Sequence, residues 1–171
     1  MYIWVMKVQE AKQRFIQTWG RLGSEWGINR TMAQVHALLL VAEKPLSTEE
    51  VMEQLNISRG NANMNLRELL NWNLVYKDLV PGDRKEYFRA EKDIWEVAKR
   101  ISRERKKREI EPVLRELKQL QDVEGNSKES KEFIATMKNI HGFADKIDKS
   151  VETMLKAEEN WFFGAIIKLL K

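Results

Sequence analysis

Residues that could read DNA bases lie close together in the segment 58–67. Arg59, Asn61, Asn63 and Asn65 follow one another at alternate positions. Asparagine can pair with N6 and N7 of adenine, and arginine can bind guanine through two parallel hydrogen bonds. Asparagine is a mediocre helix former, and the start of a helix needs only one such residue as a cap. We therefore interpret the asparagines as a base-reading set, the alternative being that they only shape a helix start.

A helix over 58–72 would hold this set on its outer side. Aliphatic residues at helical spacing predict the buried side, which turns Gly60, Met64 and Arg67 outwards. Ser58 can cap the helix, and Gly60 would let the backbone approach a phosphate at the positive helix N-terminus. The aliphatic residues are Ala62, Leu66 and Leu69.

Two further elements would position that helix. Ser47 and Glu50 form a capping box that opens a short helix over 47–55. A β-hairpin over 74–90, with its turn at 81–84, follows the second helix. Two short helices and a hairpin make a winged helix-turn-helix, in which the second helix enters the major groove. The candidate DNA-binding residues are Ser47, Thr48, Ser58, Arg59, Gly60, Asn61, Asn63, Met64, Arg67, Lys77, Arg84 and Lys85.

Helices flank this module on its N-terminal side. The first spans 7–26 and carries an apolar stripe typical of a helix packed on a partner. The second spans about 32–43, with Thr31 as its cap and Pro45 beyond its end. The stripe of the first helix contains Val8, Ala11, Phe15, Trp19, Leu22 and Trp26.

The C-terminal side is also helical. A helix opens at Asp93 and runs towards Gln121, and Pro112 should kink or restart it, because proline breaks the hydrogen-bond ladder. The segment 131–171 follows a heptad rhythm, which predicts coiled-coil packing. One seam contains Phe133, Ile140, Ile147, Met154 and Trp161, and the other contains Met137, Ala144, Val151, Glu158 and Ala165.

The fold class we expect is mainly α with one β-hairpin. A winged helix-turn-helix over 30–92 would lie between an N-terminal dimerisation helix, 1–29, and a C-terminal helical dimerisation region, 93–171. The apolar end 161–171 could lie on a membrane surface or be buried by two subunits, and we favour the dimer interface, because helices that are apolar all round are usually buried.

Composition narrows the function. The net charge is +4, and residues 56–109 hold 14 basic and 9 acidic side chains, which favours a polyanionic partner. The chain has no cysteine, and His36 and His141 lack partners at metal or catalytic spacing. We therefore expect no enzyme activity, no metal and no cofactor. No apolar run reaches the ~20 residues of a membrane helix, so we expect a cytoplasmic protein.

The sequence also resembles a known family. Residues 57–61, 65–69, 74–75 and 81–87 are similar to the GbsR branch of the MarR family of transcriptional regulators. The resemblance implies a homodimer on a palindromic operator, with interlocking terminal helices and a small-molecule effector of unknown identity. It also implies that Asp83 braces the wing and that a basic residue after it contacts the minor groove.

Two other functions fit the same elements. The winged module could contact another protein. This alternative predicts that the protein does not show salt-dependent binding of duplex DNA. It could also be an unregulated architectural DNA binder, which would bind without sequence preference.

Overall fold

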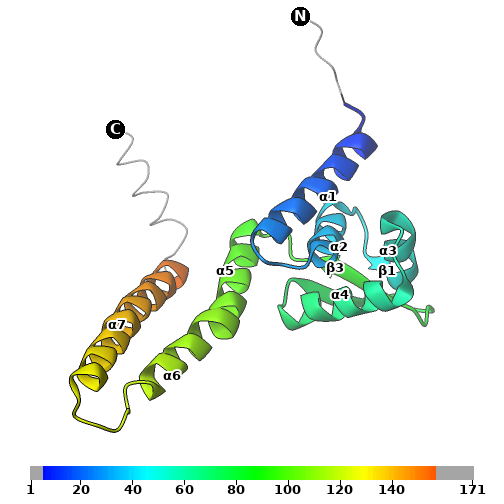
Figure 1. The fold of residues 1–171 in the computed structure, drawn as a ribbon. Helices are drawn as coiled ribbons and strands as arrows, with labels where there is room; N and C mark the ends of the chain where they lie inside the picture. The colour runs from blue at the N-terminus through cyan, green and yellow to red at the C-terminus, as the bar shows by residue number, and fades with distance from the viewer. Residues whose placement is uncertain (1–5, 157–171) are drawn as a thin grey trace, which may run out of the picture. The chain divides into compact units, whose positions relative to one another are not determined.

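The computed structural model describes residues 6–156, which belong to two compact units that meet in the chain at residues 100 and 101 (Figure 1). The fold is mostly helical with a small antiparallel sheet, as the sequence predicts. The first unit contains α1 (Val8–Glu25), α2 (Arg30–Val41), β1 (Leu46–Ser47), α3 (Thr48–Leu55), α4 (Arg59–Asn71), β2 (Val75–Leu79), β3 (Glu86–Ala90) and the start of α5 (Ile94–Arg105). The second contains the end of α5, the π-helical segment η1 (Lys106–Ile110), α6 (Glu111–Gln119) and α7 (Lys128–Lys156).

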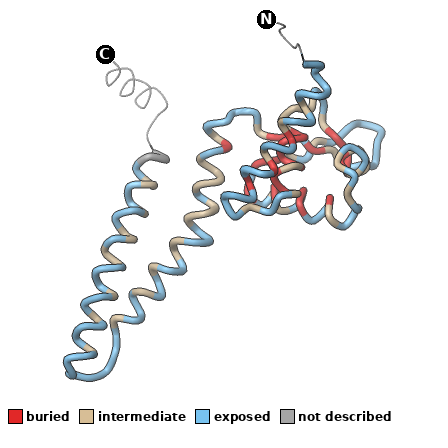
Figure 2. Tube along the Cα trace, turned by 45° about the horizontal axis from the view of Figure 1, so that its top comes forward, coloured by how far each residue is buried: buried red, intermediate tan, exposed pale blue. Residues whose placement is uncertain are grey.

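The core of the first unit lies among α1 to α4 and the sheet, where Figure 2 shows the buried positions gathered. The helices and the sheet each supply at least one side chain that is 3% exposed or less. Burying an aliphatic or aromatic side chain stabilises the fold by about 1.5–3 kcal/mol. These side chains include Ile16, Val35, Leu39, Val51, Leu66, Leu69, Leu74, Val75 and Phe88.

The sheet has three strands in the order β1-β3-β2. The sequence predicted only the two strands of a hairpin. β2 and β3 form that hairpin, and β1 pairs with β3 through Leu46 opposite Phe88 and Ser47 opposite Tyr87. A strand of two residues has no periodicity of its own, so the sequence could not predict it.

Within the subunit, α1 packs through a side other than the apolar stripe that the sequence predicts to pack on a partner. α1 packs on α2 through Ile16, Gly20 and Gly23, whereas Val8 and Trp26 of the predicted stripe are 68% and 56% exposed. Glycine allows this approach, because a Cβ on Gly23 would lie 2.6 Å from the Cβ of Ala33. The pattern of large apolar residues therefore misses a contact made by the backbone of glycine.

The start of α2 differs from the prediction as well. Asn29, and not Thr31, is the cap, because the Asn29 side chain accepts a hydrogen bond from the backbone N–H of Met32. The helix ends at Val41.

In the second unit, α7 packs against α6 and η1. Among the described residues, only one of the two predicted seams is covered: Met137, Ala144 and Val151 are half-buried, whereas Ile140 and Ile147 are 44% and 43% exposed. Lys106 of η1 reaches α7 through ion pairs with Asp148 at 3.2 Å and Glu152 at 3.4 Å. The side chain of Met154, the heptad positions Glu158, Trp161 and Ala165, and the segment 161–171 lie outside the described residues.

The break in the helix that follows α5 has a clear cause. Pro112 lies in the first turn of α6 and has no N–H to give to the carbonyl of Arg108. The chain widens into the π-helical turn η1 immediately before it. The predicted effect of Pro112 on the helix is therefore confirmed, and of the kink and the restart the structure shows the restart.

His36 lies inside the first unit, near Trp19, with the two ring centroids 6.3 Å apart. Its Nε2 is buried and has no hydrogen-bond partner among residues 6–156. Burial, and secondarily the charge of Lys92, lowers the pKa of His36 from 6.5 to about 4. The group is therefore neutral in the folded protein at neutral pH.

The close contact of α1 and α2 predicts an opposite response of two glycines. Gly23→Ala should lower the free energy of unfolding by about 1–3 kcal/mol, because the added methyl group overpacks the helix contact. Gly142→Ala in α7, where a Cβ would meet nothing within 4 Å, should raise it by up to about 1 kcal/mol. Urea denaturation measures both. Equal effects of the two changes would contradict the contact.

His36 predicts acid sensitivity. Between pH 6.5 and about 4 the unfolded chain binds a proton at His36 that the folded chain does not. The free energy of unfolding should therefore fall as the pH falls through this window, by about 3 kcal/mol in all. His36→Leu should remove this part of the pH dependence, and the control His141→Gln should keep it. Denaturation from pH 4 to 7 measures it, and an unchanged profile in His36→Leu would contradict the assignment.

Candidate nucleic-acid interface

The turn between α3 and α4 is fixed by local hydrogen bonds. The Ser47 hydroxyl accepts from the Glu50 N–H while the Glu50 carboxylate accepts from the Ser47 N–H, so the predicted capping box is present. Asn56 ends α3 in the left-handed conformation, at φ 51°, and Ser58 caps α4 as predicted. The two helices are also joined by a 3.5 Å contact between Thr48 and Asn63.

The outer side of α4 carries the residues expected there. Met64 is 59% exposed, Arg67 and Asn63 are exposed, and a Cβ on Gly60 would meet nothing within 4 Å. The opposite side is buried, with Ala62, Leu66 and Leu69 at 0–1% exposure. An open hollow lies along this outer side, lined by Gly60, Asn63, Met64, Arg67, Glu68 and Asn71.

The asparagines of α4 do not form one set. Asn65 is 3% exposed, and its amide donates to the backbone oxygen of Asn61 at 2.8 Å and to the Asn61 side chain at 2.6 Å. Asn61 is half-buried, and Asn63 is exposed. The sequence argument from three spare asparagines was therefore wrong for Asn65, which satisfies a buried polar group within its own helix.

The cap and the first residue of α3 are much less exposed to solvent than Arg59. Ser47 and Thr48 are 3% and 9% exposed, and the Ser47 side chain is occupied by the cap. Arg59 is exposed at the tip of α4, where its guanidinium donates to Glu49 at 2.8 Å.

Asp83 organises the turn of the hairpin. Its carboxylate accepts hydrogen bonds from the Lys85 N–H at 2.9 Å and from the Tyr87 hydroxyl at 2.8 Å. The same bonds lower the pKa of Asp83 and raise the pKa of Tyr87. Gly82 adopts a φ of 84°, which the turn requires and glycine adopts at little cost. The side chains that follow Asp83 therefore start from a fixed backbone.

The cations of this surface fall into two groups. Lys77 pairs with Glu86, and Arg89 pairs with Asp78 and lies over the ring of Tyr76 at 4.6 Å. Three cations form no ion pair with any residue that the structure describes: Arg67, Arg84 and Lys85. Positive charge that is not held in an ion pair within its own protein is what a polyanion would bind.

Comparison with known proteins agrees with this geometry. Residues 26–86 match the model described as the MarR family. A crystal structure of a transcriptional regulator has the same fold, with a TM-score of 0.65 at 19% identity over 85% of this chain and 95% of that one. The match spans the winged helix-turn-helix, so this part of the chain is similar to the MarR family.

Two other similarities are more distant. YvaV of Bacillus subtilis (strain 168), which bears the name "Putative HTH-type transcriptional regulator", is 24% identical over 89 residues, 52% of this chain and 50% of YvaV. This chain therefore matches about half the length of that curated relative. A mutant MepR of S. aureus bound to an oligodeoxyribonucleotide aligns with a TM-score of 0.38 and 12% identity, over 95% of this chain and 91% of MepR.

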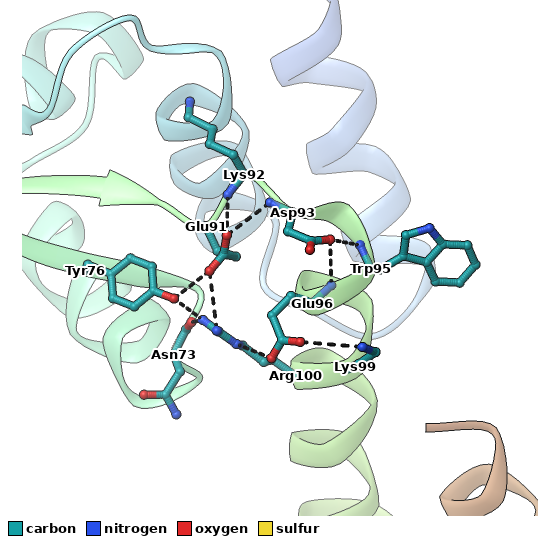
Figure 3. A network of polar contacts seen from close by, with 9 residues as sticks. All are labelled: Asn73, Tyr76, Glu91, Lys92, Asp93, Trp95, Glu96, Lys99 and Arg100. Carbon is teal, nitrogen blue, oxygen red and sulfur yellow. Dashed lines mark hydrogen bonds and ion pairs between the residues drawn. The ribbon is translucent and has the colours of Figure 1, made fainter. Parts of the chain in front are cut away.

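A polar network that the sequence did not predict fastens the wing to α5 (Figure 3). Arg100 donates to the backbone oxygen of Asn73, which ends α4 with a φ of 56°, and to the Tyr76 hydroxyl at 2.6 Å. The Tyr76 hydroxyl in turn donates to Glu91 at 2.6 Å, and Arg100 pairs with Glu91 at 3.4 Å and with Glu96 at 3.1 Å. The hydrogen bond from Tyr76 is the main cause of the lowered pKa of Glu91.

Among residues 6–156, no group of three or more histidine or acidic side chains could hold a metal ion. In the same part of the chain, no helix is both long enough and apolar enough to cross a bilayer.

The network predicts that Arg100 stabilises the domain. Arg100→Met should lower the free energy of unfolding by about 2 kcal/mol, because several part-buried acceptors lose a charged donor. Arg103→Met, an exposed arginine of the same helix, is the control and should change it by less than about 0.5 kcal/mol. Urea denaturation measures both, and similar losses in the two variants would argue against the network.

Proposed function

We propose that the protein is a MarR-family transcriptional regulator that binds duplex DNA with α4 in the major groove and the hairpin as wing. The observation that carries the proposal is the outer side of α4. It is polar and exposed although its opposite side is sealed in the core, and uncompensated cations flank it. A major groove about 12 Å wide admits one helix in this orientation.

Each proposed DNA-binding residue has a role that its position supports. Asn63 and Arg67 would read base edges, and Met64 would contact a thymine methyl group. Gly60, with Ser58 and Asn61 beside it, would bring the start of α4 to a phosphate. Ser47 and Thr48, which are mostly buried, would act through the backbone at the start of α3. Arg59, at the tip of α4, would bind a guanine edge. The remaining contacts would come from Lys77, Arg84 and Lys85, mainly to phosphates.

We further propose a homodimer on a palindromic operator. The support is apolar surface that remains exposed in the described residues and that a second subunit could bury. It lies on α1 at Val8, Leu22 and Trp26 and on α7 at Ile140 and Ile147. Dimers of this type place their recognition helices about 34 Å apart, one turn of DNA. Membership of the GbsR branch, a small-molecule effector and a cytoplasmic location belong to the same proposal.

Selection of bound duplexes from a random pool tests the DNA-binding proposal directly. We expect one enriched palindromic sequence and an affinity that falls steeply with salt, because binding cations release counterions from DNA. Asn63→Ala should then cost about 1–3 kcal/mol on the enriched duplex and relax sequence preference. Lys85→Ala should weaken all duplexes alike and reduce the salt slope by about one ion.

The exposed Lys131 of α7 offers a control of equal charge, and Lys131→Ala should leave the salt slope unchanged. Failure to bind any duplex at low salt would overturn the proposal and favour a protein-interaction module. Binding without enrichment would indicate an architectural DNA binder.

A further inference from the structure

A carboxylate lies in the middle of the surface that we propose for DNA. Glu49 is in the first turn of α3, and its side chain is 41% exposed. Its Oε1 lies 2.8 Å from Nη2 of Arg59, at the tip of α4. Since DNA is a polyanion, an acidic side chain at this place opposes binding.

The cap of α3 does not require Glu49. Ser47 and Glu50 already make both hydrogen bonds of the capping box, at 3.3 Å and 2.7 Å. Glu49 instead faces two candidate DNA-binding cations, because Arg59 holds it by an ion pair and Lys85 acts on it electrostatically. Its own backbone N–H is the main cause of its lowered pKa, with Arg59 and Lys85 adding to it, so the carboxylate is ionised at neutral pH.

We propose that Glu49 is a specificity-determining residue that acts by holding Arg59. On random DNA the affinity comes almost entirely from phosphate contacts. The ion pair with Glu49 removes Arg59 from those contacts, and the carboxylate repels the nearest phosphates. The protein therefore binds random DNA weakly.

On the operator the same pair is exchanged for better contacts. The O6 and N7 atoms of guanine offer Arg59 two acceptors, and the N4 amino group of cytosine can donate to Glu49. Glu49 thus widens the difference in affinity between operator and random DNA. This inference rests on the proposed DNA-binding function and adds a source of specificity to it.

The test compares Glu49→Gln with Glu53→Gln, the same change at an exposed glutamate one turn further along α3. Dissociation constants are measured on the selected operator and on a random duplex over a range of salt. Glu49→Gln should bind random duplex about three- to tenfold more tightly and should reduce the ratio of the two affinities at least about threefold. Its salt slope on random duplex should steepen by about one ion, because Arg59 is released. Glu53→Gln should change neither quantity.

The dependence on Arg59 is tested in a second background. In Arg59→Gln protein, adding Glu49→Gln should no longer steepen the salt slope, because the cation that it would release is absent. Arg59→Gln alone should weaken operator binding more than random-duplex binding, because only the operator contacts use Arg59 and the unpaired Glu49 repels both duplexes. It also serves as a second variant should Glu49→Gln lower the melting temperature.

The outcomes separate the two proposals. If the wild-type protein binds no duplex, the proposed function fails. If it binds its operator but Glu49→Gln behaves as Glu53→Gln, or strengthens both duplexes equally, the DNA-binding function stands and the role of Glu49 is overturned.

Discussion

The burial of one side of α4 is the interaction on which the rest of the molecule depends. Ala62, Leu66 and Leu69 are sealed against the core at 0–1% exposure, and this sets the rotation of the helix about its axis. A rotation that exposed them would cost about 1.5–3 kcal/mol for each leucine. The polar side chains on the far side face solvent as a consequence. The end of α4 continues through Asn73 into the wing, so the same burial also fixes where the hairpin begins.

Charge on the proposed DNA surface is divided between cations that the protein neutralises itself and cations that it leaves free. Arg59 and Arg89 belong to the first kind, and Arg67 and Arg84 belong to the second. The free cations supply affinity for any polyanion, whereas the paired ones must exchange one acceptor for another. A surface built in this way favours partners that offer specific hydrogen-bond acceptors. The net charge alone is therefore a poor measure of its affinity for DNA.

Local signals in the sequence predicted most of the winged helix-turn-helix. The capping box of Ser47, the cap of Ser58 and the turn near Gly82 act within a few residues, so their outcome can be read from the sequence. Contacts between distant residues could not be read in this way. The backbone approach at Gly23, the two-residue strand β1 and the network around Arg100 each require segments that only the fold brings together. The sequence pattern places Asn65 among the base-reading asparagines. Its burial depends on tertiary packing as well as on its position in α4, so the sequence alone could not show that it is buried.

The number of residues in the π-helical turn at Lys106–Ile110 sets how the side chains that follow it are rotated about the helix axis. Such a turn holds one residue more than an α-helical turn would. Deleting one residue there would restore regular α-helix and rotate every following side chain by about 100° around the helix axis. α7 packs against both η1 and α6, so it could not then keep both contacts. Chain length in this segment is therefore constrained as strictly as residue type, and homologous sequences should tolerate substitutions there far better than gaps.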